Sequence, residues 1–487
     1  MVFPIVGGTQ STGYDISNSL KFNDDDSSLL SRTPGTTATD RKKATISFWF
    51  KIGNITDSFR SLYRFNDGSG TGAVYLRSGN DLQFAWEASS SNIDVRPDGV
   101  FRDPTAWYHA FIRFDTTQST AADRVEIYIN GVERTYSTAN YPNQNDTVNH
   151  LTTDKTYYIG GDGQSSDKYF DGYIAEFNVV DGQAKSHLDF GEFNDNGVWI
   201  PKKYTGTYGN NGFHLEFKQT GTSANSSGIG ADTSGNDKHF TVTNLDATDS
   251  VEDTCTNNFA TLNTVDMHTT SPTIADGNLD FHAPAGTPFT PARATMAVTK
   301  GKWYMEYKFK SAGGGVGVMT TQSPIDDHLR DDADVRSVYR GHGGYYYGRN
   351  NGGAVDDVGG NSVTLSENDI VGVALDLDNG YVYFAKNNTY MNGQDGSTAG
   401  NPASNNGGSG GAANPSSQLL TDQHDGEWTF MAYDISTSTT GQVICNFGNP
   451  PYTPSSVETD ANGFGSFEYA PPSGFFALCT KNLAEFG

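Results

Sequence analysis

Short stretches in which apolar and polar side chains alternate recur along most of the chain. Residues 45–52 (TISFWFKI), 107–114 (WYHAFIRF) and 302–309 (KWYMEYKF) alternate with period two. That pattern predicts strands with one face toward a core and the other toward water or a second layer. Asn-Gly pairs at 130–131 and 379–380 each follow such a stretch, and Asn-Gly favours the type I′ turn of a β-hairpin. No segment keeps an apolar period of 3.6 over three turns, so we expect little α-helix.

The alternating stretches fall into two groups with a polar stretch between them. We expect an N-terminal arm at 1–18, a first β-sandwich at 19–217 and a second at 278–487. Residues 218–277 are rich in Gly, Ser, Thr, Asn and Asp and are expected to form an extended connector. Strands joined by turns, without helical segments between them, indicate antiparallel sandwiches. The predicted fold class is therefore all-β, with two antiparallel β-sandwich domains in tandem, and the family resemblance described below implies that they are jelly-roll-like.

Composition excludes several functional classes. The 487 residues include 32 Lys plus Arg and 57 Asp plus Glu, a net charge of −25. Phosphate neutralisation and docking on anionic lipid both require a basic face, so no nucleic acid partner is expected. No apolar run approaches the roughly 18 residues of a membrane-spanning helix, so no membrane insertion is expected. The first residues lack a basic segment followed by a long apolar run, so no signal peptide is expected.

The motifs that usually mark catalysis are missing from the sequence. The three cysteines, Cys255, Cys445 and Cys479, form no C-x-x-C pair, which argues against a zinc site, a redox dithiol or a disulfide framework. His109 lies in a predicted strand and no G-x-S-x-G motif supplies a nucleophile, so a packed sheet histidine is the better interpretation. The prediction is a protein without enzymatic activity or cofactor. A carboxylate pair for glycoside hydrolysis stays open, because the separation of the two groups is a three-dimensional quantity.

Asp24, Asp25 and Asp26 form the best candidate for a metal site. Three adjacent carboxylates follow Asn23, and clustered carboxylates need counter-charge or water. Oxygen ligands of this kind suit calcium. The alternative is a solvated acidic turn.

The run Gly343–Asn350 (GGYYYGRN) is the candidate for ligand binding. In a strand, Tyr345 and Tyr347 share one face. Exposed tyrosine rings can stack on the C–H faces of sugars, and Arg349 can add hydrogen bonds. The alternative is that these aromatic side chains enter the core.

Two segments of the chain resemble known families. The first sandwich resembles laminin-G-like, concanavalin A-like lectin domains, and the second is similar to SPRY (B30.2-like) domains. The pieces that carry the first resemblance are Ser19–Phe22, Ile46–Phe50, Trp107–Ala110, Ile127–Gly131, Tyr158–Gly160 and Phe170–Phe177. The pieces that carry the second are Gly301–Glu306, Val316–Val318, Asp369–Gly380, Tyr383–Asn387 and Asn446–Gly448.

The tandem arrangement, with the ending Tyr469–Leu483 (YAPPSGFFALCTKNL), looks like virion structural proteins of tailed phages, especially marine ones. The resemblance implies a non-catalytic protein on the exterior of a phage particle, at the tail or on the capsid surface. Its implied partners are other virion proteins, further copies of itself in a homo-oligomer, and a host surface polysaccharide or receptor. A tail fibre or tail-surface adhesin is the first expectation, a capsid decoration or head-fibre protein the second, and a polysaccharide depolymerase the third.

Overall fold

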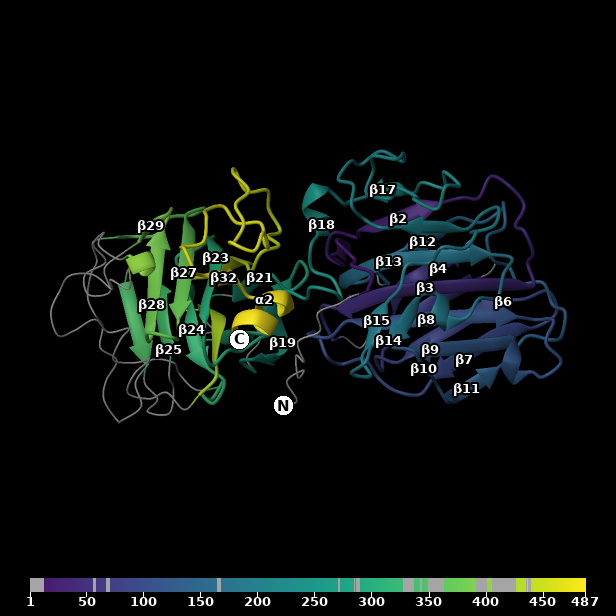
Figure 1. Cartoon of the computed structure of the whole chain (residues 1–487), viewed down its shortest axis with the longest axis horizontal. Helices are drawn as coiled ribbons and strands as arrows, with labels where there is room; N and C mark the ends of the chain where they lie inside the picture. The colour runs from purple at the N-terminus through teal and green to yellow at the C-terminus, as the bar shows by residue number, and fades with distance from the viewer. Residues whose placement is uncertain are drawn as a thin grey trace. The chain divides into compact units, whose positions relative to one another are not determined.

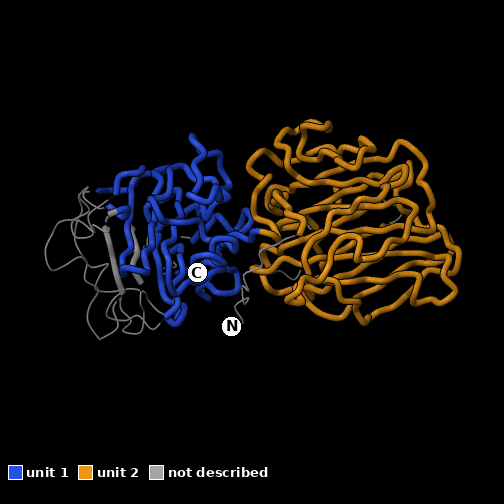
Figure 2. Tube along the Cα trace, viewed as in Figure 1, with its two compact units in different colours: residues 1–9, 257–487 blue, residues 10–256 orange. Residues whose placement is uncertain are grey.

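The chain folds into two compact units, each built from β-strands (Figure 2). Unit 1 consists of residues 1–9 and 257–487, and unit 2 of residues 10–256. The computed structural model describes residues 13–55, 58–66, 71–163, 168–269, 272–283, 285, 290–326, 337–341, 344–348, 363–390, 401–404, 426–434, 436 and 439–487.

Unit 2 contains two eight-stranded antiparallel sheets and a small hairpin (Figure 1). In sheet A the strand order is β10-β9-β8-β3-β13-β1-β18, with β16 also beside β13, and in sheet B it is β11-β7-β6-β5-β4-β12-β2-β17. The strands of sheet A are β1 (Ser19–Phe22), β3 (Lys43–Ile52), β8 (Tyr108–Asp115), β9 (Val125–Ile129), β10 (Val132–Glu133), β13 (Gly172–Asp181), β16 (Phe213–Leu215) and β18 (Ser250–Val251). Those of sheet B are β2 (Leu29–Arg32), β4 (Arg60–Asn66), β5 (Thr71–Leu76), β6 (Leu82–Glu87), β7 (Asn92–Pro97), β11 (Tyr136–Asn140), β12 (Tyr157–Ile159) and β17 (Thr241–Thr243). The hairpin is β14 (Gly191–Phe193) with β15 (Trp199–Pro201), and the 3₁₀ turns are η1 (Ala122–Arg124), η2 (His187–Asp189) and η3 (Ala247–Asp249).

The predicted alternation is visible in these strands. In β9 the pattern Val-Glu-Ile-Tyr-Ile alternates buried and half-buried side chains. Asn130 and Gly131 follow with φ values of 49° and 73°. Two consecutive positive φ values define the type I′ turn. The hairpin predicted at this Asn-Gly pair is confirmed by the pairing of β9 with β10.

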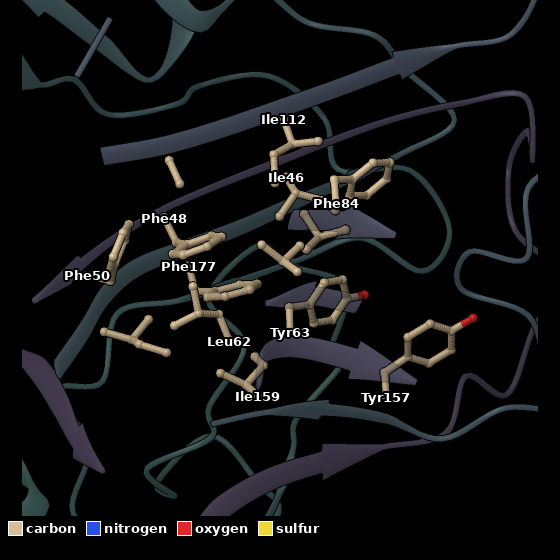
Figure 3. Packing of buried hydrophobic residues seen from close by; sticks show 14 of the residues in the cluster. Ile46, Phe48, Phe50, Leu62, Tyr63, Phe84, Ile112, Tyr157, Ile159 and Phe177 are labelled. Atoms are coloured by element: carbon tan, nitrogen blue, oxygen red, sulfur yellow. The ribbon is translucent and has the colours of Figure 1, made fainter. Parts of the chain in front are cut away.

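The core of unit 2 lies between its two sheets and is rich in aromatic rings (Figure 3). Phe48 of β3 and Phe177 of β13 stack with ring centroids 4.9 Å apart, and the Tyr63 ring of β4 meets Phe177 edge-on. Residues from both sheets therefore interdigitate, as expected for a sandwich.

Unit 1 also contains two sheets, antiparallel throughout except for β32, which runs parallel to β23. Sheet C has six strands in the order β19-β22-β30-β24-β25-β26, and sheet D has eight, in the order β20-β21-β31-β23-β27-β28-β29 with β32 beside β23. The strands of sheet C are β19 (Leu262–Met267), β22 (Pro291–Ala294), β24 (Gly314–Thr320), β25 (Ser337–Gly341), β26 (Gly344–Gly348) and β30 (Trp428–Asp434). Those of sheet D are β20 (Thr273–Ala275), β21 (Asp280–Ala283), β23 (Lys302–Phe309), β27 (Ile370–Asp376), β28 (Tyr381–Lys386), β29 (Thr389–Tyr390), β31 (Gly441–Asn446) and β32 (Phe476–Ala477). A 3₁₀ turn, η4 (Pro402–Ser404), and a short helix, α2 (Thr480–Phe486), complete the unit.

The predicted all-β class is confirmed, because strands in several antiparallel sheets make up both units. In the described part of the chain, α-helix is limited to the seven residues of α2. No helix among those residues has the length and apolar character needed to cross a membrane.

Residues 218–277, expected to form an extended connector, instead belong to the two folded units. Residues 218–256 pack on unit 2, where β17 pairs with β2 and β18 with β1. Residues 257–277 belong to unit 1 and contribute β19 and β20. The first unit thus extends past residue 217, and the second begins before residue 278.

The physical reason lies in a few isolated apolar side chains. Ile229, Phe240 and Leu245 join the core of unit 2 although polar residues surround them in the sequence. Burying one phenylalanine side chain contributes about 2–3 kcal/mol, enough to hold a polar stretch against a sheet without any regular period. The described part of the expected N-terminal arm, residues 13–18, is held in the same way, because Ile16 is buried in unit 2.

Candidate functional site

A β-bulge in β13 positions the most unusual side chain of unit 2, Glu176. Ala175 pairs with Trp49, but Asn178 pairs with Ser47, so β13 carries one residue more than β3 at this point. Glu176 has a φ of 51°, in the left-handed region that is costly for a non-glycine residue by about 1–3 kcal/mol. Its carboxylate is nevertheless buried.

Glu176 lies at the centre of a chain of polar contacts. The Tyr14 hydroxyl donates to its Oε2 at 3.1 Å, and His214 Nε2 lies 2.8 Å from its Oε1. His214 Nδ1 in turn lies 2.8 Å from the Thr233 hydroxyl. Burial alone lowers the pKa of His214, but the charge of Glu176 and its hydrogen bond outweigh burial and raise that pKa. Glu176 therefore stabilises the protonated form of the buried His214 imidazole.

A cavity of about 70 Å³ opens beside this chain. It is lined by Tyr14, Asp15, Ile16, Ser17, Glu176, Lys203, Glu216 and Lys218. Acidic, basic and hydroxyl groups surround a space that holds a few water molecules. Pockets that enclose larger ligands have about 300–1,000 Å³, so this cavity does not enclose a sugar ring.

His109 of β8 is a buried structural histidine, as its position in a strand predicts. Trp199 Nε1 donates to His109 Nδ1 at 3.1 Å, and His109 Nε2 lies 2.9 Å from the Ser47 hydroxyl. Since an indole N–H can only donate, the imidazole proton resides on Nε2 and is donated to Ser47. Burial, assisted by the charge of His187, lowers the pKa of His109 to about 3. In this arrangement His109 cannot accept the hydroxyl proton of Ser47, as a catalytic base would have to.

Unit 1 holds a second buried carboxylate, Glu306 of β23. Its Oε1 accepts hydrogen bonds from the Tyr304 hydroxyl and the Tyr469 N–H, and its Oε2 accepts from Asn446 Nδ2 and the Glu468 N–H. Burial raises the pKa of Glu306 to about 7 although all four hydrogen bonds favour the charged form. The carboxylate fixes the backbone at 468–469 against sheet D, which is a structural role.

The three candidate metal ligands do not converge. Asp24 is half-buried and accepts a 3.5 Å hydrogen bond from Asn54, whereas Asp25 and Asp26 are exposed. Asn23 Nδ2 donates to Asp26 Oδ2 at 2.9 Å. Burial and the charge of Asp25 raise the pKa of Asp24, which a bound cation would oppose. The described residues contain no group of three or more His, Cys, Asp or Glu side chains arranged to hold a metal ion, so these aspartates do not fit calcium, which takes about six to eight oxygen ligands.

The tyrosine candidates lie in β26, an edge strand of sheet C. Tyr345 pairs with Arg340 and Tyr347 with Val338 of β25, so the two tyrosine positions share one face of the sheet. The side chains of this hairpin lie outside what the structure describes, and so does Arg349. The ligand-binding role of Tyr345, Tyr347 and Arg349 stays a prediction.

Sequence reasoning missed the chain through Tyr14, Glu176 and His214. These residues are far apart in the sequence and match no motif. One signal was available: Ile174 and Phe177 both enter the core of unit 2, and a spacing of three between core residues breaks the period of two. Such a break predicts a bulge.

Comparison with known proteins finds a family match for part of unit 2. Residues 23–187 match the family model of the concanavalin A-like lectin/glucanases superfamily. This part of the chain is a concanavalin A-like, laminin G-like lectin domain, and it spans β2 to β13 of the two sheets.

Several solved structures are similar to parts of the chain at low identity. A putative carbohydrate binding protein from Bacteroides ovatus is 14% identical, over 47% of this chain and 58% of that one, with a TM-score of 0.31. Mouse laminin alpha1 chain domains LG4-5 are 10% identical, over 97% of this chain and 88% of that one, with a TM-score of 0.28. The SPRY domain of human HERC1 is 16% identical, over 34% of this chain and 87% of that one, with a TM-score of 0.22. A search of the curated proteins found no match.

Proposed function

We propose that this chain is a non-catalytic glycan-binding protein of a phage particle, namely a tail fibre or tail-surface adhesin that attaches to polysaccharide on the host surface. The observation that carries the proposal is the match of residues 23–187 to the concanavalin A-like lectin/glucanases superfamily. Those residues supply most strands of both sheets of unit 2. A rigid sandwich of this kind presents its loops and outer surfaces to a ligand while the sheets act as scaffold.

The superfamily description names glucanases as well as lectins, so binding must be weighed against hydrolysis. Glycoside hydrolysis needs a carboxylic acid and a second carboxylate flanking the bond to be cleaved. Glu176 is buried and engaged by Tyr14 and His214, and Glu306 is buried and accepts four hydrogen bonds. These contacts support a structural role for both carboxylates and favour binding without turnover.

The position on the particle rests on the resemblance of the tandem domains to virion proteins of tailed phages. The partners that follow are neighbouring virion subunits, further copies of this chain and the host polysaccharide. A net charge of −25 supports an exterior surface that stays soluble and avoids the packaged nucleic acid.

A binding and turnover assay tests this function. The full chain is incubated with a panel of bacterial surface polysaccharides, and both bound protein and newly formed reducing ends are measured over time. We expect saturable binding to at least one polysaccharide with no increase in reducing ends. Reducing ends that accumulate with time would replace the adhesin with a depolymerase. Failure to bind any polysaccharide would favour a capsid decoration or head-fibre protein that contacts only its own virion.

A further inference from the structure

Exposed apolar side chains gather around one tryptophan of unit 2. Seven large apolar residues in the described part of the chain are exposed, and four of them, at 48–51% exposure, are Val132, Leu188, Phe193 and Val198. Phe193 and Val198 flank Trp199 in its hairpin, and Val132 and Leu188 follow Gly131 and His187, two residues that lie against the Trp199 ring. Trp199 itself is buried, at 7% exposure. We call Trp199 with these four residues the Trp199 surface. Single exposed apolar residues are ordinary, whereas a contiguous group of them marks a site of interaction.

Several contacts bring these residues together. Phe193 pairs with Trp199 across the β14–β15 hairpin, and their ring centroids are 5.0 Å apart. Val198 precedes Trp199 in the chain. A Cβ added to Gly131 would overlap the Trp199 ring, and Val132, the first residue of edge strand β10, follows Gly131 in the chain.

The hairpin that presents these side chains is rigid. Asn194 Oδ1 accepts hydrogen bonds from the N–H groups of Asn196 and Val198, at 3.0 and 2.9 Å. Gly197 completes the turn with a φ of 74°. The Trp199 indole is held in place by the hydrogen bond that its Nε1 donates to His109 of sheet A. The side chains are therefore held in place before any ligand arrives, which reduces the entropy lost on binding.

A stack of rings continues the apolar face toward η2. His187 lies with its ring centroid 5.8 Å from Trp199 and stacks on Tyr128 at 4.0 Å. Leu188 follows His187 and is one of the four exposed residues. Because Trp199 is buried and the His187 and Tyr128 rings face one another, the exposed aromatic ring of this group is that of Phe193, at 48% exposure. An exposed aromatic ring can stack on the C–H face of a pyranose.

The rim of the Trp199 surface is acidic. Glu133, Asp189 and Asp195 are exposed beside Val132, Leu188 and the hairpin turn, and Glu192 is half-buried and paired with Lys202 at 3.3 Å. Carboxylates accept hydrogen bonds from sugar hydroxyls. They repel an anionic polysaccharide, and they repel the same acidic rim on a second copy of this chain. The charge therefore argues against an anionic polysaccharide and against a second copy, and the carboxylate acceptors suit a partner rich in hydroxyl donors.

We propose that the Trp199 surface is a glycan subsite in which a pyranose ring of a neutral polysaccharide stacks on Phe193, with the rim carboxylates accepting hydrogen bonds from the sugar hydroxyls. This inference rests on the proposed function and adds to it the place and the charge class of the ligand. It assigns the contact to the β14–β15 hairpin and the edge of sheet A.

Affinity electrophoresis of the full chain tests the subsite. Native gels contain dextran, laminarin or yeast mannan as neutral probes, or alginate as an anionic probe. The variants are Phe193→Ala and Val198→Ala, with Val457→Ala of unit 1 as a control of similar exposure. We expect retardation by at least one neutral polysaccharide, weakened by about tenfold or more in Phe193→Ala, a loss typical of a central aromatic contact. Val198→Ala should weaken it less and Val457→Ala should leave it unchanged, with all three variants melting as the parent does.

The remaining outcomes separate this inference from the proposed function. Undiminished retardation of Phe193→Ala overturns the subsite and leaves glycan binding standing. Alginate retardation that equals or exceeds that of the neutral probes overturns the charge argument. If the parent protein is retarded by none of these probes, the subsite as proposed is overturned, whereas the proposed function is decided separately by the assay with bacterial surface polysaccharides. If sedimentation shows a dimer that Phe193→Ala dissociates while retardation is unchanged, the surface belongs to a second copy of the chain.

Discussion

Acidification should destabilise unit 2 through two histidines buried in neutral form. His109 and His150 are both almost fully buried, and burial lowers the pKa of each to about 3. His150 is surrounded by the rings of Tyr63, Trp86 and Phe114, which provide no counter-charge. Below its ordinary pKa of about 6.5 the unfolded chain binds a proton that the folded chain does not. Stability is therefore lost as the pH falls from 6.5 toward 3.

The size of the effect follows from the two pKa values. Each histidine should remove about 2 kcal/mol of unfolding free energy between pH 7 and pH 5, at about 1.4 kcal/mol per pH unit below 6.5. The raised pKa of His214 acts in the opposite direction, since the folded state then holds its proton more tightly. The net change in unit 2 is thus smaller than the sum for His109 and His150, and a variant is needed to isolate one of them.

Unit 1 should respond with the opposite sign. The pKa of Glu306 is raised to about 7, above its ordinary value of about 4.5. The folded state then binds the proton more tightly, so stability rises as the pH falls from 7 toward 4.5. The same arithmetic gives an increase of about 2 kcal/mol in the unfolding free energy of unit 1 when the pH falls from 7 to 5. The two units therefore act as internal controls for one another.

Hydrogen exchange of the full chain, corrected for the intrinsic effect of pH, measures both units at once. Between pH 7 and pH 5 we expect protection to fall in β4 and β6 and to rise in β23. His150→Gln should reduce the pH dependence of unit 2 by about 2 kcal/mol and leave that of unit 1 unchanged, and Glu306→Gln should do the reverse. A pH dependence of unit 2 that is the same in His150→Gln and the parent would refute the reasoning.

Three further predictions concern single side chains. Cys445 and Cys479 are fully buried, and burial raises the pKa of Cys479 to about 12. Cys255 is only partly buried, although burial and the charge of Glu176 raise the pKa of its thiol as well. A thiol reagent should therefore label Cys255 slowly and before the other two in the native protein, and labelling of Cys445 without denaturant would contradict this packing. Gly131 and Gly197 have nearly equal positive φ values, but of the two only Gly131 would place an added Cβ against the Trp199 ring. In urea unfolding, Gly197→Ala should lower the unfolding free energy by about 1 kcal/mol and Gly131→Ala by about 2–4 kcal/mol. Equal losses would rule out the overlap. Tyr14→Phe removes the hydroxyl that donates to Glu176, so urea unfolding should show a loss of about 1–2 kcal/mol, and no loss would mean that water replaces that hydroxyl.

The sequence predicted the strands whose side chains alternate and failed where burial depends on single residues. β3, β8 and β23 follow the predicted alternating stretches, and the Asn130–Gly131 turn lies where the dipeptide predicts it. Alternation is a local property and can be counted along the chain. Phe240 becomes core only because β2 and β17 meet, and no window of sequence around Phe240 contains that information. The same holds for the clustered aspartates Asp24, Asp25 and Asp26, since adjacency in the sequence does not make carboxylates converge, and the described residues contain no group of three arranged to hold a metal ion.

The chain through Glu176 and the Trp199 surface are linked by a second layer of side chains on the outer face of sheet A. All ten residues of β13 are buried. In a sheet with one face exposed to solvent, every second residue of a strand would be exposed instead. Ile16, Trp49, Ala175 and Trp199 form a small apolar cluster on that face. The alternating sequence of β3 predicts either water or a second layer on its outer face. The structure has a second layer there. It is built from the segment at 13–18 and the β14–β15 hairpin, which carry Tyr14 and Phe193, and this explains why neither residue could be assigned a role from the sequence of the sheet alone.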